Sequence, residues 1–293
     1  MSRASLENVS DLSTKAHWDE IHAAERKLLP APGRGGFKQA VKNHLGPGIL
    51  GRVSAYSDYV LWNVIFPRHL HPATGGKVLE IGSAPGEFLV RFSRAYGCVP
   101  YGVEYSEIGA ELNRAVFRRN GIGPDHVIQA DFFSDDFRER YYEFFDVVVS
   151  RGFIEHFSDL KPVIDRHLDL LKPGGCLVVD IPNLRGLNRA LARFFDKGAI
   201  ARHNLEIMRK DAFERLFDRP DLQRIFSGYY GTFSFYLFTA DRSPLSRSVL
   251  KAAHKIQPVL NLAFRTVPGM GRAESAFASP FLNYIGKRVC RNR

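Results

Sequence analysis

The stretch KVLEIGSAPGEF, residues 77–88, decides the fold. A short apolar run ends in Gly82, and a second glycine, Gly86, opens a helical pattern four residues later. Glycines at such a place let the backbone turn sharply and approach a ligand closely. The spacing G-x-x-x-G differs from the G-x-G-x-x-G dinucleotide fingerprint, and no G-K-S/T follows, which excludes a P-loop. The stretch therefore predicts a strand, a ligand-binding turn and a helix.

Strands and helices alternate downstream of this unit. The sequence predicts further strands over residues 99–106, 126–131, 144–150 and 176–182, with helices between them. The unbroken run Val147–Val149 is typical of a parallel strand that is buried on both faces. This rhythm predicts an α/β fold, a doubly wound and mostly parallel sheet with right-handed crossovers.

The same reading divides the chain into four segments. Residues 1–76 are predicted to form a helical N-terminal cap, with helices over 16–30 and 56–70 and with Val60 and Val64 facing inward. The core follows over 77–240 and includes an aromatic strand over 225–239. A basic, amphipathic helical insertion (241–279) and the last core strand with its tail (280–293) complete the chain.

Charge is distributed unevenly along the 293 residues, which carry 41 Lys and Arg against 31 Asp and Glu. From Arg242 to Arg293 there are ten basic residues and one acid, Glu274, a net of +9 (10 − 1). The rest is nearly neutral, with 31 basic and 30 acidic residues (41 − 10 and 31 − 1). Any electrostatic attraction to an anionic partner is therefore expected in the C-terminal segment.

Three cysteines, at positions 98, 176 and 290, suggest neither a disulfide framework nor a metal site. The N-terminus lacks the apolar core of a secretory signal, and no apolar run reaches the roughly 18 residues of a membrane span. We therefore expect a cytoplasmic protein, with peripheral contact to the inner membrane face as a further hypothesis.

Acidic side chains follow the next two strands after Gly82. Glu104 lies 24 residues beyond Glu80 (104 − 80) at the end of a strand, where a carboxylate can accept both hydrogen bonds of a ribose diol. Asp131 ends the following strand and precedes Phe132. An acid beside an aromatic ring suits adenine, because the carboxylate accepts from the exocyclic amine and the ring covers a face.

These stretches together resemble the class I S-adenosylmethionine (SAM)-dependent methyltransferases. VLEIGSAPGEF resembles the family's glycine-rich motif, VEYS its ribose-binding motif and QADFF its adenine-binding motif. FDVVVSRGFIEHFSD and LKPGGCLVVDIPN resemble its fourth and fifth strand motifs. The resemblance covers residues 77–183 and, more loosely, the last two strands. It implies a seven-stranded Rossmann-like sheet and SAM as cofactor, with S-adenosylhomocysteine (SAH) as product.

The resemblance also assigns roles at the cofactor site. It implies that Gly82 and Gly86 pass under the methionine part, that Glu104 binds the ribose and Asp131 the adenine amine, and that Ser150 lies near the amino group. The implied cofactor-binding residues are Glu80, Gly82, Ser83, Ala84, Gly86, Glu104, Tyr105, Asp131, Phe132, Ser150 and Arg151.

Methyl transfer from a sulfonium needs orientation and exclusion of water, and an aliphatic hydroxyl acceptor also needs a general base. His156, six residues after Ser150 (156 − 150), is the first candidate base; Glu155 and His203 are the others. For both histidines a structural role is an open alternative. Arg151 is expected near an acidic substrate or the cofactor carboxylate, with a surface role as the alternative. The sequence predicts no metal site.

The chain lacks the N/D-P-P-Y/F motif of enzymes that methylate bases or glutamine, since SRGF stands there; E-H-F-x-D instead resembles the small-molecule branch. We therefore expect O-methylation of a small molecule or of a lipid- or sugar-linked intermediate by SN2 transfer with a His general base. The alternatives are an RNA or protein methyltransferase and a non-catalytic SAM-binding regulator.

The C-terminal insertion repeats apolar residues every three or four positions and places basic residues on another face. The apolar set is Leu245, Val249, Ala253, Ile256, Leu260, Ala263 and Val267, and the basic set is Arg247, Lys251 and Lys255. One interpretation is a helix packed on the sheet with a solvated charged face. The other is contact of residues 243–272 with an anionic membrane. Nucleic-acid binding ranks last, and a homodimer is a further hypothesis.

Overall fold

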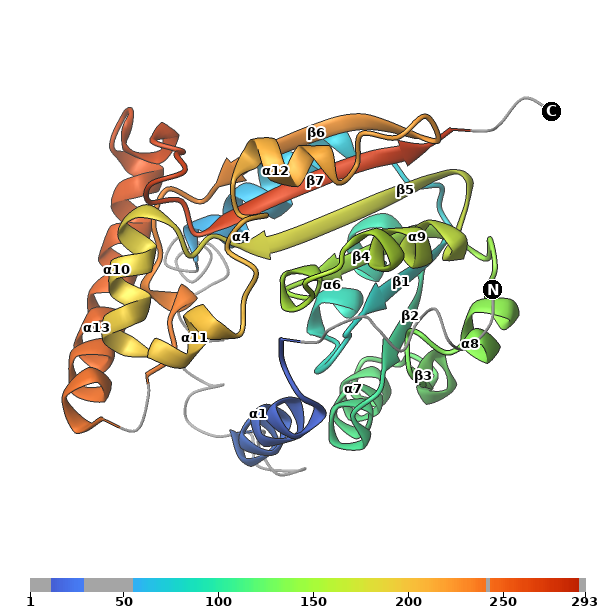
Figure 1. The fold of residues 1–293 in the computed structure, drawn as a ribbon, viewed down its shortest axis with the longest axis horizontal. Helices are drawn as coiled ribbons and strands as arrows, with labels where there is room; N and C mark the ends of the chain where they lie inside the picture. Colours follow the sequence, from blue (N-terminus) through green and yellow to red (C-terminus); the bar gives the residue numbers. More distant parts are fainter. Residues whose placement is uncertain (1–11, 29–54, 241–242, 290–293) are drawn as a thin grey trace.

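The computed structural model describes residues 12–28, 55–240 and 243–289, and its centre is one seven-stranded sheet (Figure 1). The strand order is β3-β2-β1-β4-β5-β7-β6. The strands are β1 (Lys77–Ile81), β2 (Val99–Glu104), β3 (Val127–Gln129), β4 (Phe145–Arg151), β5 (Leu171–Pro182), β6 (Leu222–Tyr230) and β7 (Phe281–Arg288). The predicted fold class is confirmed.

Strands β1 to β5 run parallel, whereas β7 is antiparallel to both of its neighbours, β5 and β6. Val147 and Val149 of β4 belong to the core cluster on one side of the sheet, and Val148 belongs to the cluster on the other side. The unbroken valine run thus packs on both faces, as a central parallel strand requires. The parallel strands bring their carboxyl ends to one edge.

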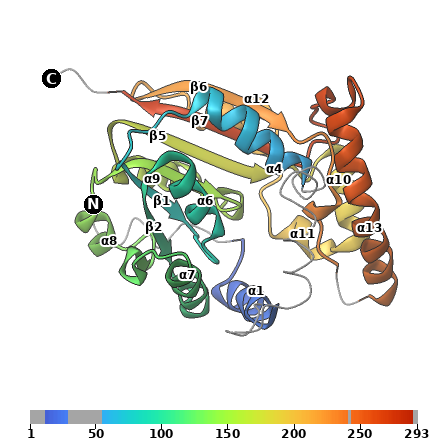
Figure 2. The same cartoon turned by 180° about the vertical axis from the view of Figure 1, so that it is seen from behind.

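Helices cover both faces of the sheet, so the fold has three layers (Figures 1 and 2). The longer helices are α1 (Lys15–Leu28), α4 (Tyr56–Val60) continued by η2 (Leu61–Ile65) and α5 (Phe66–His69), α6 (Glu87–Tyr96), α7 (Glu107–Arg119), α8 (Asp135–Arg140), α9 (Lys161–Leu170), α10 (Gly186–Phe195), α11 (Lys197–Ala201), α12 (Lys210–Arg215) and α13 (Pro244–Thr266). Short 3-10 turns are η3 (Pro124–His126), η4 (Ile154–His156), η5 (Phe235–Leu237) and η6 (Met270–Arg272).

The helix predicted over residues 56–70 is present, but the prediction that Val64 faces inward is wrong. Val60 is buried as expected, whereas Val64 is 46% exposed. The segment Leu61–Ile65 is π-helical, and its wider turn carries Val64 outward while Leu61 and Ile65 stay buried. Residues 29–54 of the predicted cap lie outside the described residues.

The aromatic strand predicted over residues 225–239 is shorter than expected. β6 ends at Tyr230, because Gly231 adopts a φ of +94° and turns the chain away from the sheet. A Cβ on Gly231 would lie 2.6 Å from the Cβ of Ser57, so the turn also lets the chain pass close to α4. The aromatic residues that follow form η5 instead of extending the strand.

Helix α13 packs through a stripe that shares only Ala253 with the predicted apolar set. Its buried residues are Ser246, Leu250, Ala253, Gln257, Asn261 and Phe264. Gln257 Oε1 accepts a hydrogen bond from Phe235 N at 2.6 Å, and Asn261 Oδ1 accepts from Tyr56 N at 3.3 Å. The buried side thus combines apolar residues with amides, because Gln257 and Asn261 bind free backbone groups of η5 and α4.

The predicted apolar stripe of α13 therefore faces outward along much of its length. Its exposed members are Leu245, Val249, Ile256 and Val267, joined by Val259 and Leu262. Within the described residues, no helix combines the length and the apolar character that crossing a bilayer requires.

Candidate cofactor and acceptor site

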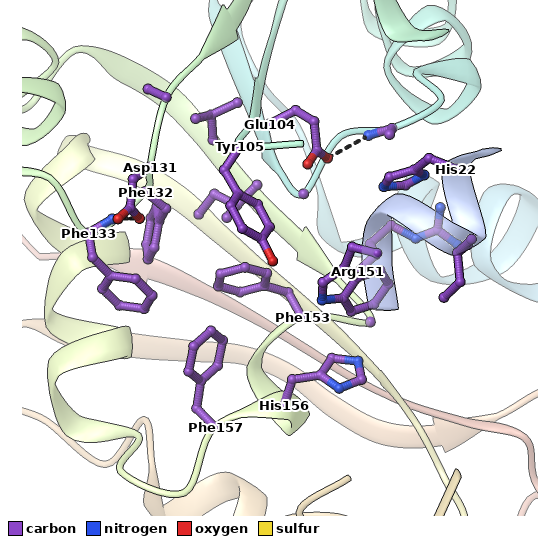
Figure 3. Close-up of a pocket in the computed structure, with 18 residues that line it drawn as sticks. His22, Glu104, Tyr105, Asp131, Phe132, Phe133, Arg151, Phe153, His156 and Phe157 are labelled. Carbon is purple, nitrogen blue, oxygen red and sulfur yellow. Dashed lines mark hydrogen bonds between the residues drawn. The ribbon is translucent and has the colours of Figure 1, made fainter. Parts of the chain in front are cut away.

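A cavity of about 300 Å³ opens where the carboxyl ends of β1, β2 and β4 meet (Figure 3). Figure 3 shows Asp131, Phe132 and Phe133 at one end, with Arg151 and His156 at the other. Predicted cofactor-binding residues in its wall are Gly82, Ala84, Glu104, Tyr105, Asp131, Phe132 and Arg151. Ligands of doubly wound sheets bind at this edge.

Glu104 is held rigidly at the end of β2. Its Oε1 accepts from Ser106 N at 2.9 Å, and its Oε2 is 3.4 Å from Ala84 N in the glycine-rich turn. Burial raises the pKa of Glu104, and the hydrogen bond from Ser106 is the largest of the effects that lower it. The carboxylate thus joins the first two strand-end turns and presents itself to the cavity at a fixed position.

Asp131 and Phe132 form the opposite end of the cavity. Asp131 is exposed, and its Oδ1 accepts from Phe133 N at 2.9 Å. It does not cap the following helix, because that role belongs to Ser134, which accepts from Phe137 N. Phe132 is buried and packs edge-on against Phe153, with ring centroids 5.4 Å apart. Both predicted residues therefore line the cavity, one polar and one aromatic.

A second cavity, of about 600 Å³, adjoins the first. The two share wall residues from three elements: Trp18 and Ile21 of α1, Gly82 and Ala84 after β1, and Arg151, Gly152 and His156 after β4. The remaining wall is mixed: Leu184, Ala192, Phe238 and Phe281 are among its apolar residues, and Asp196 and Arg202 are among its charged ones. Two ligands seated in these cavities would meet at the shared wall.

Buried carboxylates lie beside the shared wall. Glu80 is 5% exposed, and burial raises its pKa to about 8, against the lowering effect of Arg151. Asp180 Oδ2 accepts from the Tyr230 hydroxyl at 2.8 Å and lies 3.6 Å from Arg151 Nε. Burial raises the pKa of Asp180 to about 6, and Arg151 opposes this shift. Arg151 is thus the positive charge that the two acids share.

The three predicted catalytic residues lie together in the second cavity. Glu155, His156 and His203 all line it, and the His156 and His203 ring centroids are 4.6 Å apart. Burial lowers the pKa of His156 to about 3 and lowers that of His203. Burial raises the pKa of Glu155 to about 8. Both imidazoles are therefore neutral at physiological pH.

Hydrogen bonds fix the tautomer of each histidine. His156 Nδ1 lies 2.9 Å from the carbonyl oxygen of Arg202, and His203 Nδ1 lies 2.6 Å from that of Ala199. A carbonyl oxygen only accepts, so each Nδ1 carries the proton and each Nε2 keeps its lone pair. Ser13 Oγ is also 2.8 Å from His156 Nδ1. The free lone pairs are therefore on the Nε2 atoms.

Three predicted cofactor-binding residues lie outside both cavity walls. Ser83 Oγ bonds to Asn113 Nδ2 at 2.6 Å, and Ser150 is fully buried. Gly86 has a φ of +101° at the start of α6, where an added Cβ would lie 2.2 Å from Asn113 Oδ1. These residues shape the turn and the end of β4, and their contact with a cofactor stays a prediction.

Helix α1 closes the site, which the motifs do not indicate. Trp18, Ile21 and His22 line the first cavity, and Asp19 Oδ1 accepts from Ser106 Oγ at 2.6 Å (Figure 2 shows α1 beside α7). The Trp18 ring packs edge-on against His156 at 5.0 Å. Only the spacing of Trp18 and Ile21 on one helical face could have indicated a covering role.

The donor set of the first cavity fits SAM. Glu104 and Asp131 supply acceptors for ribose hydroxyls and an adenine amine, and Phe132 supplies a ring face. Near the shared wall, the buried Oε2 of Glu80 has no hydrogen-bond partner within the described part of the chain, so it can accept from an ammonium group. Gly82 has a φ of +67° and no side chain, so its backbone can lie close to a bound cofactor. A Cβ added to Gly82 would point toward Phe153 and occupy part of that space.

Comparison with known proteins supports this assignment. A family model described as a methyltransferase domain matches residues 61–225. A ubiquinone biosynthesis O-methyltransferase from Shewanella sp. (strain ANA-3) is 30% identical over 101 residues, 34% of this chain and 41% of that enzyme. One from Chelativorans sp. (strain BNC1) is 27% identical over 127 residues, 43% of this chain and 48% of that enzyme. The matches thus span less than half of these relatives.

A solved structure shares the fold at low sequence identity. The geranyl diphosphate C-methyltransferase from Streptomyces coelicolor A3(2) superposes with a TM-score of 0.51 and 17% identity, over 77% of each chain. This likeness concerns the fold alone, because fold and chemistry are separable.

Proposed function

The chain belongs to the class I SAM-dependent methyltransferases, and from this premise we propose that it methylates a hydroxyl oxygen of a small aromatic acceptor. The observation that carries the proposal is the pair of adjoining cavities with a shared wall at Gly82, Arg151, Gly152 and His156. The curated relatives support oxygen as the acceptor atom, because both are named O-methyltransferases.

SAM supplies an electrophilic methyl group on its sulfonium. Glu104 and Asp131 orient the nucleoside end, and Trp18 of α1 excludes water from the shared wall. The second cavity, at about 600 Å³ and with apolar and ionisable side chains in its wall, has the size and lining of a small-molecule site. These residues hold two reactants in line, which is the main requirement of a displacement at carbon.

The weak basicity of the histidines favours an acceptor whose hydroxyl group loses its proton easily. His156 offers its Nε2 lone pair, yet a pKa of about 3 makes it a weak proton acceptor at neutral pH. A phenolic hydroxyl loses its proton far more readily than an aliphatic one, with a pKa of about 10 in tyrosine. We therefore favour a phenol or catechol over a sugar hydroxyl.

Incubation of the full chain with SAM and a panel of phenols, catechols and sugars tests this function. We expect SAH to accumulate only with a phenolic acceptor, and the product to gain one methyl group on oxygen by mass spectrometry. Methylation of carbon or nitrogen alone, or SAH release with sugars only, would contradict the proposal. Calorimetric titration with SAH confirms in parallel that the protein used is competent to bind.

The acceptor is proposed to be lipid-linked, because an exposed apolar and basic helix lies beside the second cavity. α13 contacts α10 and η5, and both of these elements contribute to the cavity wall. Residues 243–272 contain five basic residues and no acid, so the exposed stripe of α13 is complementary to an anionic surface.

Vesicle sedimentation measures this contact. Exchanging Lys251 and Lys255 for Glu should weaken binding to phosphatidylglycerol-containing vesicles at least about 30-fold, since each basic residue contributes roughly 1 kcal/mol. Replacing Ile256 and Val259 with Ser should weaken it similarly. The matched control is Arg118→Glu with Arg119→Glu on α7, which makes the same charge change at exposed positions. Equal losses in control and test would refute a role for α13.

A further inference from the structure

A buried carboxyl group, that of Glu155, lies against the two histidines of the second cavity. Glu155 is 0% exposed, and neither of its carboxyl oxygens has a hydrogen-bond partner among the residues that the structure describes. Its Oε1 lies 3.9 Å from His156 Nε2, too far for a hydrogen bond. A buried polar group that is left unsatisfied is costly, so this carboxyl group points to a ligand that the site would bind.

The neighbouring donors are arranged as ligands. One oxygen of Glu155, one nitrogen of His156 and one of His203 all lie within 4.8 Å of one another. Each histidine already gives its Nδ1 proton to a backbone carbonyl, which leaves Nε2 as the donor atom. Metal-binding histidines are oriented by this kind of second hydrogen bond. The arrangement therefore contains both the ligands and the groups that orient them.

From this geometry we infer that Glu155, His156 and His203 bind one divalent transition-metal ion in the acceptor cavity. Two imidazole nitrogens and one carboxylate suit Zn²⁺, Mn²⁺, Fe²⁺ or Co²⁺ better than Mg²⁺, which prefers oxygen ligands alone. Ligands of one ion lie roughly 3.3 Å apart, so modest side-chain rotation closes the site. Three protein ligands leave coordination positions open toward the cavity.

The open positions give the ion a role, and this second step rests on the proposed function. A hydroxyl that coordinates a divalent ion loses its proton at a lower pH than the free hydroxyl. The ion would thus activate the acceptor hydroxyl. The acceptor O–H bond breaks, its proton passes to solvent, and the oxygen lone pair then forms the bond to the methyl carbon as the carbon–sulfur bond breaks.

Metal binding is tested on the full chain without SAM or acceptor, so its outcome is independent of activity. We expect chelated and dialysed protein to take up one equivalent of added Zn²⁺ or Co²⁺ per chain, measured by mass spectrometry of the eluted metal. Bound Co²⁺ should also give a ligand-field absorption band. Mg²⁺ at the same concentration should not displace it. Uptake well below one equivalent by folded wild-type protein would overturn the inference.

Variants locate the ion. Glu155→Gln keeps the shape of the side chain and should lower Zn²⁺ affinity at least about tenfold, and His203→Ala should do likewise. His126→Ala, remote from the cavity wall, is the matched control and should bind as wild type. Zn²⁺ should raise the melting temperature of wild type and control but not of the two site variants. Unchanged affinity in both site variants would place the ion elsewhere and refute the site.

The role of the ion has a separate readout. In the proposed function, added Zn²⁺, Mn²⁺ or Co²⁺ should shift the acid limb of the rate–pH profile of chelated enzyme to lower pH with a phenolic acceptor. A metal-bound enzyme with an unchanged profile would overturn the role. An inactive protein that still binds one ion at Glu155 would contradict the proposed function and uphold the site.

Discussion

Replacing Glu104 with Ala should weaken SAH binding about a hundredfold or more. A carboxylate that accepts two hydrogen bonds from a ribose diol contributes roughly 1.5–3 kcal/mol for each bond. Loss of both bonds, at 3 kcal/mol together, corresponds to about a hundredfold in affinity. The substitution should also loosen the two strand-end turns, because Glu104 accepts hydrogen bonds from Ser106 N and Ala84 N. Isothermal titration calorimetry with SAH measures the change.

Glu107→Ala is the matched control for this substitution, because Glu107 is exposed in the first turn of α7 and does not line the cavity. Its affinity should equal that of wild type. Glu104→Gln tests the charge separately, since an amide keeps one acceptor oxygen and should bind better than the alanine variant. An affinity for Glu104→Ala within threefold of wild type, about 0.65 kcal/mol, would exclude Glu104 from the ribose site.

Replacing Phe92 with Ala should destabilise the protein by about 3–5 kcal/mol. Phe92 on α6 is fully buried, and its ring packs against Trp62, Phe66, Phe88 and Tyr96. The cavity left behind cannot close easily, because these neighbours belong to different elements. Urea unfolding, with slopes compared between variants, measures the change in the free energy of unfolding.

Val64→Ala serves as the control in the same part of the fold. Val64 is 46% exposed on the π-helical segment, so its truncation should change the free energy of unfolding by no more than about 0.5 kcal/mol. The sequence pattern predicts Val64 as a core residue, which would instead give about 1 kcal/mol or more for the deleted methyl groups. Together the two variants therefore test whether Phe92 belongs to the core and whether Val64 faces solvent.

Much of the central sheet could be predicted, because its signals are local. The parallel strands are apolar runs bounded by polar, proline or glycine residues, and Glu104 at the end of β2 and Asp131 just after β3 line one cavity. Strand periodicity and turn residues act within a few positions of one another. Such signals survive in a single sequence because no distant contact is needed to interpret them.

What could not be predicted depends on contacts between distant residues. His203 reaches His156 across 47 positions (203 − 156), and α1 covers the cavity from before the first strand. In α13 the buried stripe includes two amides, since Gln257 and Asn261 bind backbone groups of other elements. The apolar pattern of α13 therefore predicts the wrong buried side. Amide side chains are favoured where a helix packs on free backbone groups, because they can form hydrogen bonds with them.

The position of β7 between β5 and β6 leaves β5 without one of its neighbours during translation. Cys176 of β5 pairs with Lys287 of β7, 111 residues later (287 − 176). At roughly 5–20 residues per second, a ribosome needs about 6–22 s to translate that interval, during which one edge of β5 has no partner. The half-finished sheet thus presents an open strand edge to the cell, so chaperone capture of the nascent chain should begin once β5 leaves the exit tunnel and end after β7 does.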